Sequence, residues 1–397
     1  MVVAEPTSSF VNPFGFRFWC IVASGFAYFL ALAILNPVIP IYAKRSLHGD
    51  GTTVGIAVGA FALGAVLLRP FAGRLGDRRG RKLLLVGGAL VVAAATAGYG
   101  IVHSLQWLVF ARIVAGVGEA AFFVGGATMV ADAAPEDQRG QAVSYWSIAV
   151  YGGLAIGPFV GEAVLGGAGL EHYTRAWLIS SACAVVAALL GCLTREGPRE
   201  SAASGHKTPL LHRNALGPGV VLLLGLIGLA GWSGFVKLYA RSDLGTDRVG
   251  GVFLTYGVII LAIRILGARL PDRVGARRAC TAALLLGAAG MVIVASWASI
   301  VGLYVGTAVF AVGMSLIYPA LLLMTLDGVA PNERASVVGT FSSFFDLSQG
   351  LGAAVCGTIQ VGIGYRGMFA VTAAFAVCAL VYLRVVLTSS SGASGSM

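Results

Sequence analysis

Long apolar stretches separated by short polar loops dominate this sequence and limit what the chain can fold into. A helix that crosses a bilayer needs about 20 mostly apolar residues, and twelve such stretches follow one another between residues 18 and 386. Of the 397 residues, 57% are hydrophobic and only 11% are charged, whereas soluble domains carry about 25% charged residues. The sequence therefore predicts an all-α integral membrane protein.

The predicted spans form two groups of six, separated by the longest polar stretch. We expect a first six-helix bundle over residues 1–194, a linker over 195–215 and a second bundle over 216–388. Residues 389–397 form a low-complexity tail, which is expected to be disordered. The twelve predicted spans are 18–42, 53–72, 83–102, 106–131, 141–165, 175–194, 216–240, 250–268, 279–298, 300–326, 336–359 and 366–386.

A basic stretch after the second predicted span returns after the eighth. Residues 69–82 read RPFAGRLGDRRGRK, and residues 264–278 read RILGARLPDRVGARR, 195 residues later. Each copy holds a single acid, Asp77 or Asp272, with a glycine three residues further on. Because this spacing is close to half the chain length, the repeat indicates an internal duplication.

The distribution of Lys and Arg predicts how the chain lies in the membrane. Most of its 27 basic residues fall in alternate loops, and loops rich in Lys and Arg stay in the cytoplasm. This bias predicts a multi-pass protein of the cell (inner) membrane with both termini and the linker on the cytoplasmic side. The net charge of +10 comes from short loops beside the spans, so we expect the bilayer, and not nucleic acid, as its partner.

No motif indicates an enzyme, a metal site or an ATP-driven pump. The six cysteines lie in apolar spans without a CxxC pair, and the five histidines all fall in loops. Cysteines in this setting are expected to be small core residues. No phosphate-binding GxxxxGK[ST] loop occurs, so ATP is not predicted as the energy source. We expect no cofactor, a monomer, and a small molecule and protons as partners.

The layout of six plus six spans with a repeated basic loop resembles the major facilitator superfamily. The signature loop of that family, Gly-x-x-x-Asp-Arg-x-Gly-Arg-Arg/Lys, is matched completely by the first copy. The second copy is looser, with Ala268 in place of the first glycine and Pro271 before the acid. The resemblance implies that these loops form a cytoplasmic gate. The implied gate residues are Gly73, Asp77, Arg78, Gly80, Arg81, Asp272 and Arg273.

The fifth predicted span carries a second motif, Gly153, Gly157, Pro158 and Gly161, which resembles the antiporter motif of drug and metabolite exporters in the superfamily. Glycines repeated every four residues form one smooth ridge, against which another helix can pack closely. A proline inside a helix removes one backbone donor and can bend the helix. The resemblance favours export over uptake.

Charged residues inside the spans are the best candidates for substrate and proton chemistry. A charge at the bilayer centre costs about 2.5–3.5 kcal/mol, so it is retained for a reason. Glu119 and Asp346 lie near the middle of the fourth and eleventh spans, and Arg112 precedes Glu119 by seven residues. Unlike the loop charges, none has a charged counterpart in the other half. Both acids are candidate proton carriers; the alternative is a static ion pair between Arg112 and Glu119.

Four further charged residues lie near the ends of predicted spans. Arg69 and Arg264 occupy equivalent places near inner ends, and we expect them to extend toward lipid headgroups or to pair with loop acids. Glu162 and Lys237 lie near outer ends, where they are expected to reach water in the same way.

Together these features predict a proton-coupled secondary transporter that exports drugs or lipophilic metabolites by alternating access. Two alternatives remain. One is a proton symporter that imports a nutrient, against which the motif in the fifth span argues. The other is a non-transporting membrane sensor or scaffold, against which the charges at mid-membrane argue.

Overall fold

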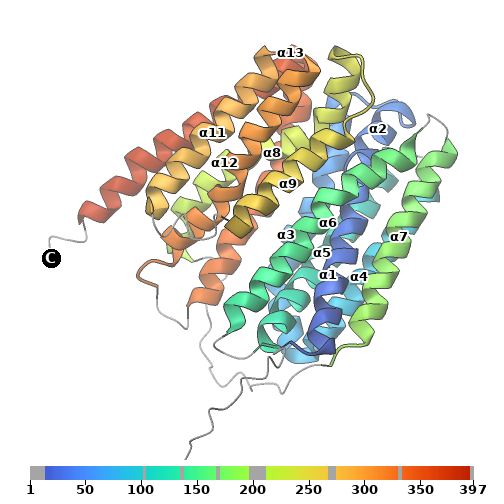
Figure 1. Ribbon diagram of the computed structural model, residues 1–397, viewed down its shortest axis with the longest axis vertical. Helices are drawn as coiled ribbons and strands as arrows, with labels where there is room; N and C mark the ends of the chain where they lie inside the picture. The colour runs from blue at the N-terminus through green and yellow to red at the C-terminus, as the bar shows by residue number, and fades with distance from the viewer. Residues whose placement is uncertain are drawn as a thin grey trace, which may run out of the picture.

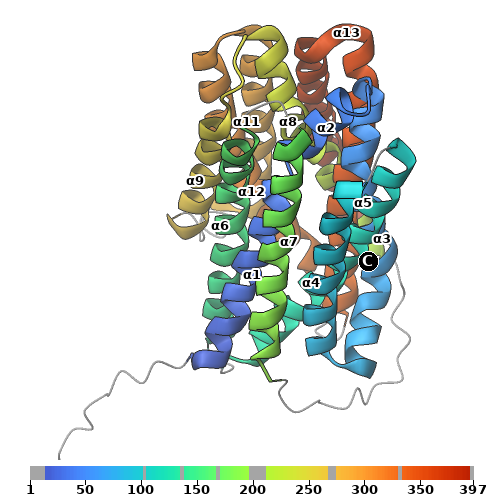
Figure 2. The same ribbon diagram turned by 90° about the vertical axis from the view of Figure 1, so that its right-hand side faces the viewer.

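The computed structural model describes residues 14–101, 104–134, 138–166, 170–195, 212–266, 274–329 and 333–393. Within this described part the chain forms long helices and no strand (Figure 1), and the helices run side by side along most of their length (Figure 2). The helices are α1 (Phe16–Ile34), α2 (Val38–Arg45), α3 (Gly51–Arg79), α4 (Arg81–Gly98), α5 (Leu105–Asp132), α6 (Arg139–Leu165), α7 (Leu170–Cys192), α8 (Arg213–Asp243), α9 (Gly250–Leu266), α11 (Ala276–Ser296), α12 (Ile300–Leu326) and α13 (Arg334–Ala393).

Ten helical segments of the described chain are long and apolar enough to cross a membrane. One of them, Phe16–Arg45, contains both α1 and α2, which are separated by a short break at residues 35–37. Another lies within α13, where Gly364 has a non-helical backbone (φ 74°, ψ 179°) that interrupts the 60-residue helix. The shorter apolar helix α9 completes the set. The prediction of an all-α protein with several membrane-spanning helices is confirmed.

The repeated basic stretch is helical over most of its first copy. Helix α3 continues to Arg79, and the chain turns at Gly80 (φ 110°, ψ 142°) before α4 begins. Gly275, 195 residues later, has nearly the same backbone (φ 92°, ψ 133°) at the start of α11. Only glycine adopts a positive φ of this kind without strain. The shared conformation agrees with the duplication inferred from the sequence.

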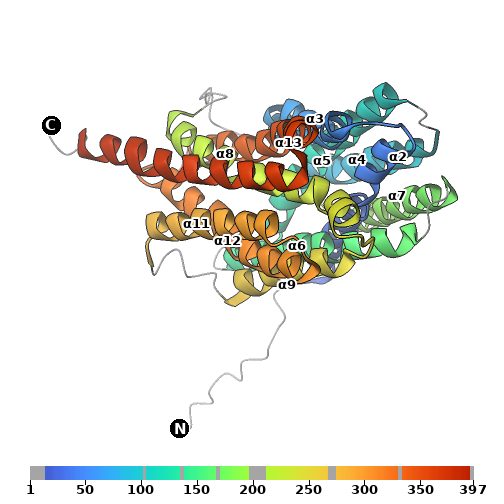
Figure 3. The same cartoon turned by 90° about the horizontal axis from the view of Figure 1, so that it is seen from above.

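The helices pack around two apolar cores of buried residues. The smaller core joins side chains of α1, α4, α5, α6 and α7, and the larger one extends from α2 and α3 into α8–α13. Viewed from above in Figure 3, α9, α11 and α12 lie together, apart from α4, α5 and α7. Two long contacts connect the N-terminal helices with the C-terminal ones. Helix α3 packs along α13, and α6 packs along α9.

The contact between α3 and α13 is close enough to exclude side chains. A Cβ atom added at Gly55 would meet the backbone of Ala353, and one added at Gly59 would meet the backbone of Gly350. Small residues let two helix backbones approach in this way. The contact brings the following turns of α3, including Arg69, beside α13.

Asp50 caps the N-terminus of α3, and its removal provides a test of the described helix start. Its carboxylate accepts a hydrogen bond from the Thr53 backbone N–H at 2.8 Å, and hydrogen bonds from Thr53 lower the pKa of Asp50. We expect Asp50→Ala to lower the thermal unfolding midpoint of the purified protein by about 1–3 °C. Asp50→Asn, which keeps an acceptor, should change the midpoint less.

The pH dependence of this effect has a defined sign. Because the folded-state pKa is lowered, the stabilisation is complete above the ordinary aspartate pKa and is lost as the pH falls through the lowered value. The difference in unfolding midpoint between the wild type and Asp50→Ala should therefore shrink in acid. A difference that grows in acid would contradict the capping role.

Candidate functional site

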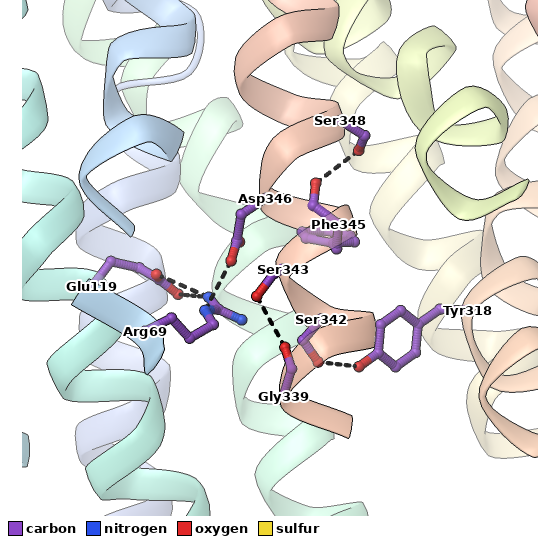
Figure 4. Close-up of polar contacts among 9 residues, drawn as sticks. All are labelled: Arg69, Glu119, Tyr318, Gly339, Ser342, Ser343, Phe345, Asp346 and Ser348. Atoms are coloured by element: carbon purple, nitrogen blue, oxygen red, sulfur yellow. Dashed lines mark hydrogen bonds and ion pairs between the residues drawn. The ribbon is translucent and has the colours of Figure 1, made fainter. Parts of the chain in front are cut away.

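Arg69 of α3 lies between two acids from other helices, Glu119 of α5 and Asp346 of α13 (Figure 4). Its Nη2 is 3.2 Å from Oε2 and 3.4 Å from Oε1 of Glu119, and its Nε is 2.8 Å from Oδ2 of Asp346. The Nε–H does not point at Oδ2, so this second contact is an ion pair without hydrogen-bond geometry. One guanidinium thus connects three helices.

The three charged side chains are almost completely enclosed by protein. The side chain of Arg69 is 12% exposed, that of Glu119 10% and that of Asp346 8%. Bulk water therefore does not screen these charges. The Phe123 ring centroid lies 5.4 Å from Cζ of Arg69 and contributes a cation–π contact. Tyr318 of α12 shares a 2.9 Å hydrogen bond with Ser342 of α13, and Figure 4 shows it across α13 from Arg69.

The balance of charge at this site indicates what it can do chemically. One guanidinium faces two carboxylates, so the cluster carries a net charge of −1 when both acids are ionised. A buried charge without a partner is costly, and one bound proton makes the cluster neutral. The cluster can therefore change its charge by binding or releasing one proton.

The structure brings together both acids that the sequence singled out, but the expectation for Arg69 is wrong. It neither extends to headgroups nor pairs with a loop acid, because α3 continues to Arg79 instead of ending near residue 72. Ten residues of α3 follow Arg69, so Arg69 lies inside the helix and not at its end. A longer estimate of this span would have marked Arg69 as a fourth intramembrane charge, beside Arg112, Glu119 and Asp346.

Arg112 does not form the static ion pair with Glu119 that the sequence analysis gave as an alternative. It donates from Nε to the Ala57 carbonyl and from Nη2 to the Val58 carbonyl, each at 3.1 Å, and its Cζ lies 4.7 Å from the Phe61 ring centroid. Arg112 thus fastens α5 to α3. The static ion pair between Arg112 and Glu119 is wrong; a part for Arg112 in substrate or proton chemistry stays a prediction.

The glycine ridge of α6 packs against α1. A Cβ atom at Gly153 would come within 2.7 Å of the Leu30 backbone nitrogen, and one at Gly161 would meet the Ile34 carbonyl oxygen. Gly157 and Pro158 are buried between these contacts. The close approach expected of the ridge is present, and its partner is the first helix.

A second ion pair joins α6 to α8. Nζ of Lys237 lies 2.6 Å from Oε1 of Glu162 and also donates to the Asp247 carbonyl at 2.6 Å. The Val249 backbone N–H donates to the same Glu162 oxygen at 2.6 Å. Since the Lys237 side chain is only 8% exposed, the expectation that Lys237 and Glu162 simply reach water is wrong.

The structure describes part of the implied gate. Gly80 makes the turn between α3 and α4, and Arg81 forms an ion pair with Asp132 that joins the start of α4 to the end of α5. Gly73 lies within α3 and not at a turn. Four of the predicted gate residues are not covered: the side chains of Asp77 and Arg78, and the whole of Asp272 and Arg273, lie outside the described residues. Among the described residues, no cluster of His, Cys, Asp and Glu could hold a metal ion.

Removing Arg69 tests whether the three charges act as a unit. Arg69→Gln leaves two buried carboxylates without a cation, and breaking a buried ion pair in this way costs about 3–5 kcal/mol. We expect this variant to unfold at a clearly lower temperature in detergent. Arg69→Gln/Glu119→Gln/Asp346→Asn should recover much of the loss, because no unpaired charge remains. A triple variant less stable than Arg69→Gln would show that the residues contribute independently.

Several known proteins are similar to this chain over most of its length. An uncharacterised transporter of the major facilitator type from Salmonella typhimurium is 29% identical over 378 residues, which cover 92% of this chain and 94% of the relative. Multidrug resistance protein 1 of Bacillus subtilis is 27% identical over 358 residues, which cover 87% of this chain and 90% of that protein.

A solved structure with the same fold is a bacterial homologue of the human lysosomal transporter Spinster in an inward-facing and unoccupied conformation. It is similar to this chain with a TM-score of 0.78 and 18% identity, over 92% of this chain and 96% of that one. At this identity the likeness shows the fold alone. The family model of the Major Facilitator Superfamily matches residues 21–262 and 233–395. The chain therefore belongs to the Major Facilitator Superfamily.

Proposed function

We propose that this protein is a proton-coupled transporter that exports small lipophilic molecules by alternating access. The observation that carries the proposal is the single guanidinium of Arg69, which is shared by the buried carboxylates of Glu119 and Asp346. A site of this composition can bind and release one proton at mid-membrane. It needs neither a metal nor a nucleotide to change its charge.

The proposal includes twelve spanning helices in two halves, residues 1–194 and 216–388, joined by the linker 195–215. Helices α1 and α2 together form the first span, and Gly364 divides α13 into the last two. Both termini then lie in the cytoplasm. Arg69 and Glu119 belong to the first half and Asp346 to the second, so the ion pair between Arg69 and Asp346 connects the halves.

Coupling follows from this placement. When Asp346 is ionised, it holds Arg69 and keeps α3 against α13. A proton on Asp346 removes that attraction and leaves Arg69 to Glu119 alone, so the two halves separate more readily at this depth. Because the proton changes how readily the halves separate, a substrate that binds one conformation more tightly also changes the proton affinity of the cluster.

The ion pair between Glu162 and Lys237 supports an inward-facing state. It joins α6 of the first proposed half to α8 of the second at the end of the molecule that we assign to the outside. The close contact of Gly55 with Ala353 lies toward the same end. Opening toward the outside would break both contacts.

Two features favour export. The ridge of Gly153, Gly157 and Gly161 belongs to the motif that resembles the antiporter motif of exporters, and it packs tightly against α1. The relative from Bacillus subtilis is named a multidrug resistance protein. A nutrient importer that uses the same cluster would move its substrate inward with protons, and the direction of transport decides between the two.

Neutralising the two acids tests the proton coupling. In proteoliposomes with an imposed pH gradient, Glu119→Gln and Asp346→Asn should each lose gradient-driven transport of lipophilic dyes that the wild type moves, while dye binding in detergent persists. The matched control is Asp50→Asn, which alters an acid outside the spans. Wild-type stoichiometry in both variants would show that neither acid carries the proton. Dye movement in the same direction as protons would identify an importer.

A second prediction concerns the proposed cytoplasmic gate. Asp77→Asn should slow transport several-fold without changing the amount of folded protein, because the resemblance gives the lone acid of the basic loop a gating contact. Arg79→Gln is the matched control, since Arg79 lies two residues further along the same basic stretch and is exposed. Initial rates in the same proteoliposomes compare the two variants. Equal rates would remove Asp77 from the gate.

A further inference from the structure

Arg264 of α9 is the counterpart of Arg69 in the duplicated stretch, but it pairs with no acid among the described residues. Its guanidinium lies over the ring of Tyr151 in α6, with Cζ 4.0 Å from the ring centroid. Its Nε is buried and has no hydrogen-bond partner, and none of the described carboxylates forms an ion pair with it. The positive charge of Arg264 is thus partly buried and is not neutralised by any described acid.

The duplication explains which groups are missing. Shifting Asp346 back by 195 residues gives Tyr151, and shifting Glu119 forward by 195 gives Met314. Tyr151 is the residue that Arg264 contacts, just as Asp346 is a residue that Arg69 contacts. The geometry of the pair is retained, whereas both carboxylates have been replaced by neutral side chains. No carboxylate among the described residues balances Arg264, and a bound anion would supply the counter-charge.

A cavity of about 360 Å³ adjoins Arg264 between α6, α9 and α12, a volume within the range of small-molecule sites. Ser147 contributes a hydroxyl to its wall, and Ile148, Leu261 and Leu316 contribute apolar surface. A charged group beside a mostly apolar wall suits a ligand with one charged end and an apolar body. A hydroxyl in the same wall can donate a further hydrogen bond to a bound anion.

One wall of the cavity is connected to α13, the helix that carries Asp346. Pro319 of α12 lines the cavity, and its neighbour Tyr318 shares a 2.9 Å hydrogen bond with Ser342 of α13. A ligand that shifts this part of α12 would therefore act on the helix that supplies Asp346.

We propose that Arg264 binds the anionic group of an amphipathic organic anion, a carboxylate or phosphate with an apolar body that lies in this cavity. The inference rests on the proposed function in one respect, namely that the anion is a transported substrate. The anion comes either from solution or from the headgroup of an anionic phospholipid in the surrounding bilayer.

Binding to the purified protein in neutral detergent, at one pH and without a gradient, tests the inference. The probes are octanoate, 1-octanol and octylammonium, which share an apolar chain and differ in charge. Isothermal titration should give an affinity for octanoate at least tenfold higher than for the other two. Arg264→Gln should lower the octanoate affinity at least tenfold, whereas the exposed control Arg79→Gln should not change it. Equal binding of octanoate and octanol, or an unchanged affinity in Arg264→Gln, would overturn the proposal.

A second pair of variants keeps the test decisive if Arg264→Gln does not fold. Tyr151→Asp recreates the carboxylate found beside Arg69 and should abolish octanoate binding by supplying an internal counter-charge. Tyr151→Phe keeps the ring and should retain binding. Octanoate binding that survives Tyr151→Asp undiminished would contradict a site at Arg264.

Nanodiscs distinguish the two sources of the anion. If a phospholipid headgroup occupies the site, phosphatidylglycerol added to phosphatidylcholine should weaken octanoate binding, and native mass spectrometry should show phosphatidylglycerol retained by the wild type and lost from Arg264→Gln. If the anion comes from solution, the octanoate affinity should be equal in both membranes.

The outcome is separable from that of the proposed function. Loss of coupling in Glu119→Gln with octanoate binding intact would support both ideas. Normal coupling in both acid variants together with Arg264-dependent octanoate binding would overturn the proton carriers and leave the anion site standing.

Discussion

The position of Arg69 between two buried carboxylates is the constraint on which the rest of the structure depends. An ion in a protein interior loses its hydration, and only partners in contact can replace it. Arg69 therefore requires α3, α5 and α13 to meet at one depth. The glycines that let α3 lie directly on α13, Gly55 and Gly59 among them, make that meeting possible. Packing of small residues and pairing of charges are thus two parts of one arrangement.

The sequence predicted the helices and the two buried acids but not the residue that unites them. Hydropathy and the cost of a buried charge are properties of a short segment, so Glu119 and Asp346 could be recognised without a structure. Ion pairing depends on which faces of distant helices meet and on where a helix ends. The seven-residue spacing of Arg112 and Glu119 suggested a partner, yet Arg112 instead donates to backbone carbonyls of α3. The sequence alone does not show that α3 lies beside Arg112.

Lys237 and Glu162 illustrate the same limit near the end of the helices. A long charged side chain near a helix end usually extends to water, which is a sound rule when nothing covers that end. Here the segment after α8 folds back, and its backbone at Asp247 and Val249 completes the hydrogen bonds of the pair. A loop of polar residues therefore produces an enclosed ion pair. Its conformation could not be inferred from composition, because the backbone and not the side chains supplies the contacts.

The duplicated stretch shows how one scaffold can carry two chemistries. Gly80 and Gly275 share a backbone conformation, and Arg69 and Arg264 occupy matching places, but carboxylates accompany only the first arginine among the described residues. A guanidinium keeps its charge at every physiological pH. A proton can therefore change the environment of Arg69 through its acids, whereas at Arg264 the proposed anion would change the local charge by binding or leaving. On our proposals, one half of the molecule responds to protons and the other to an anion. Their coupling then requires no residue that serves both.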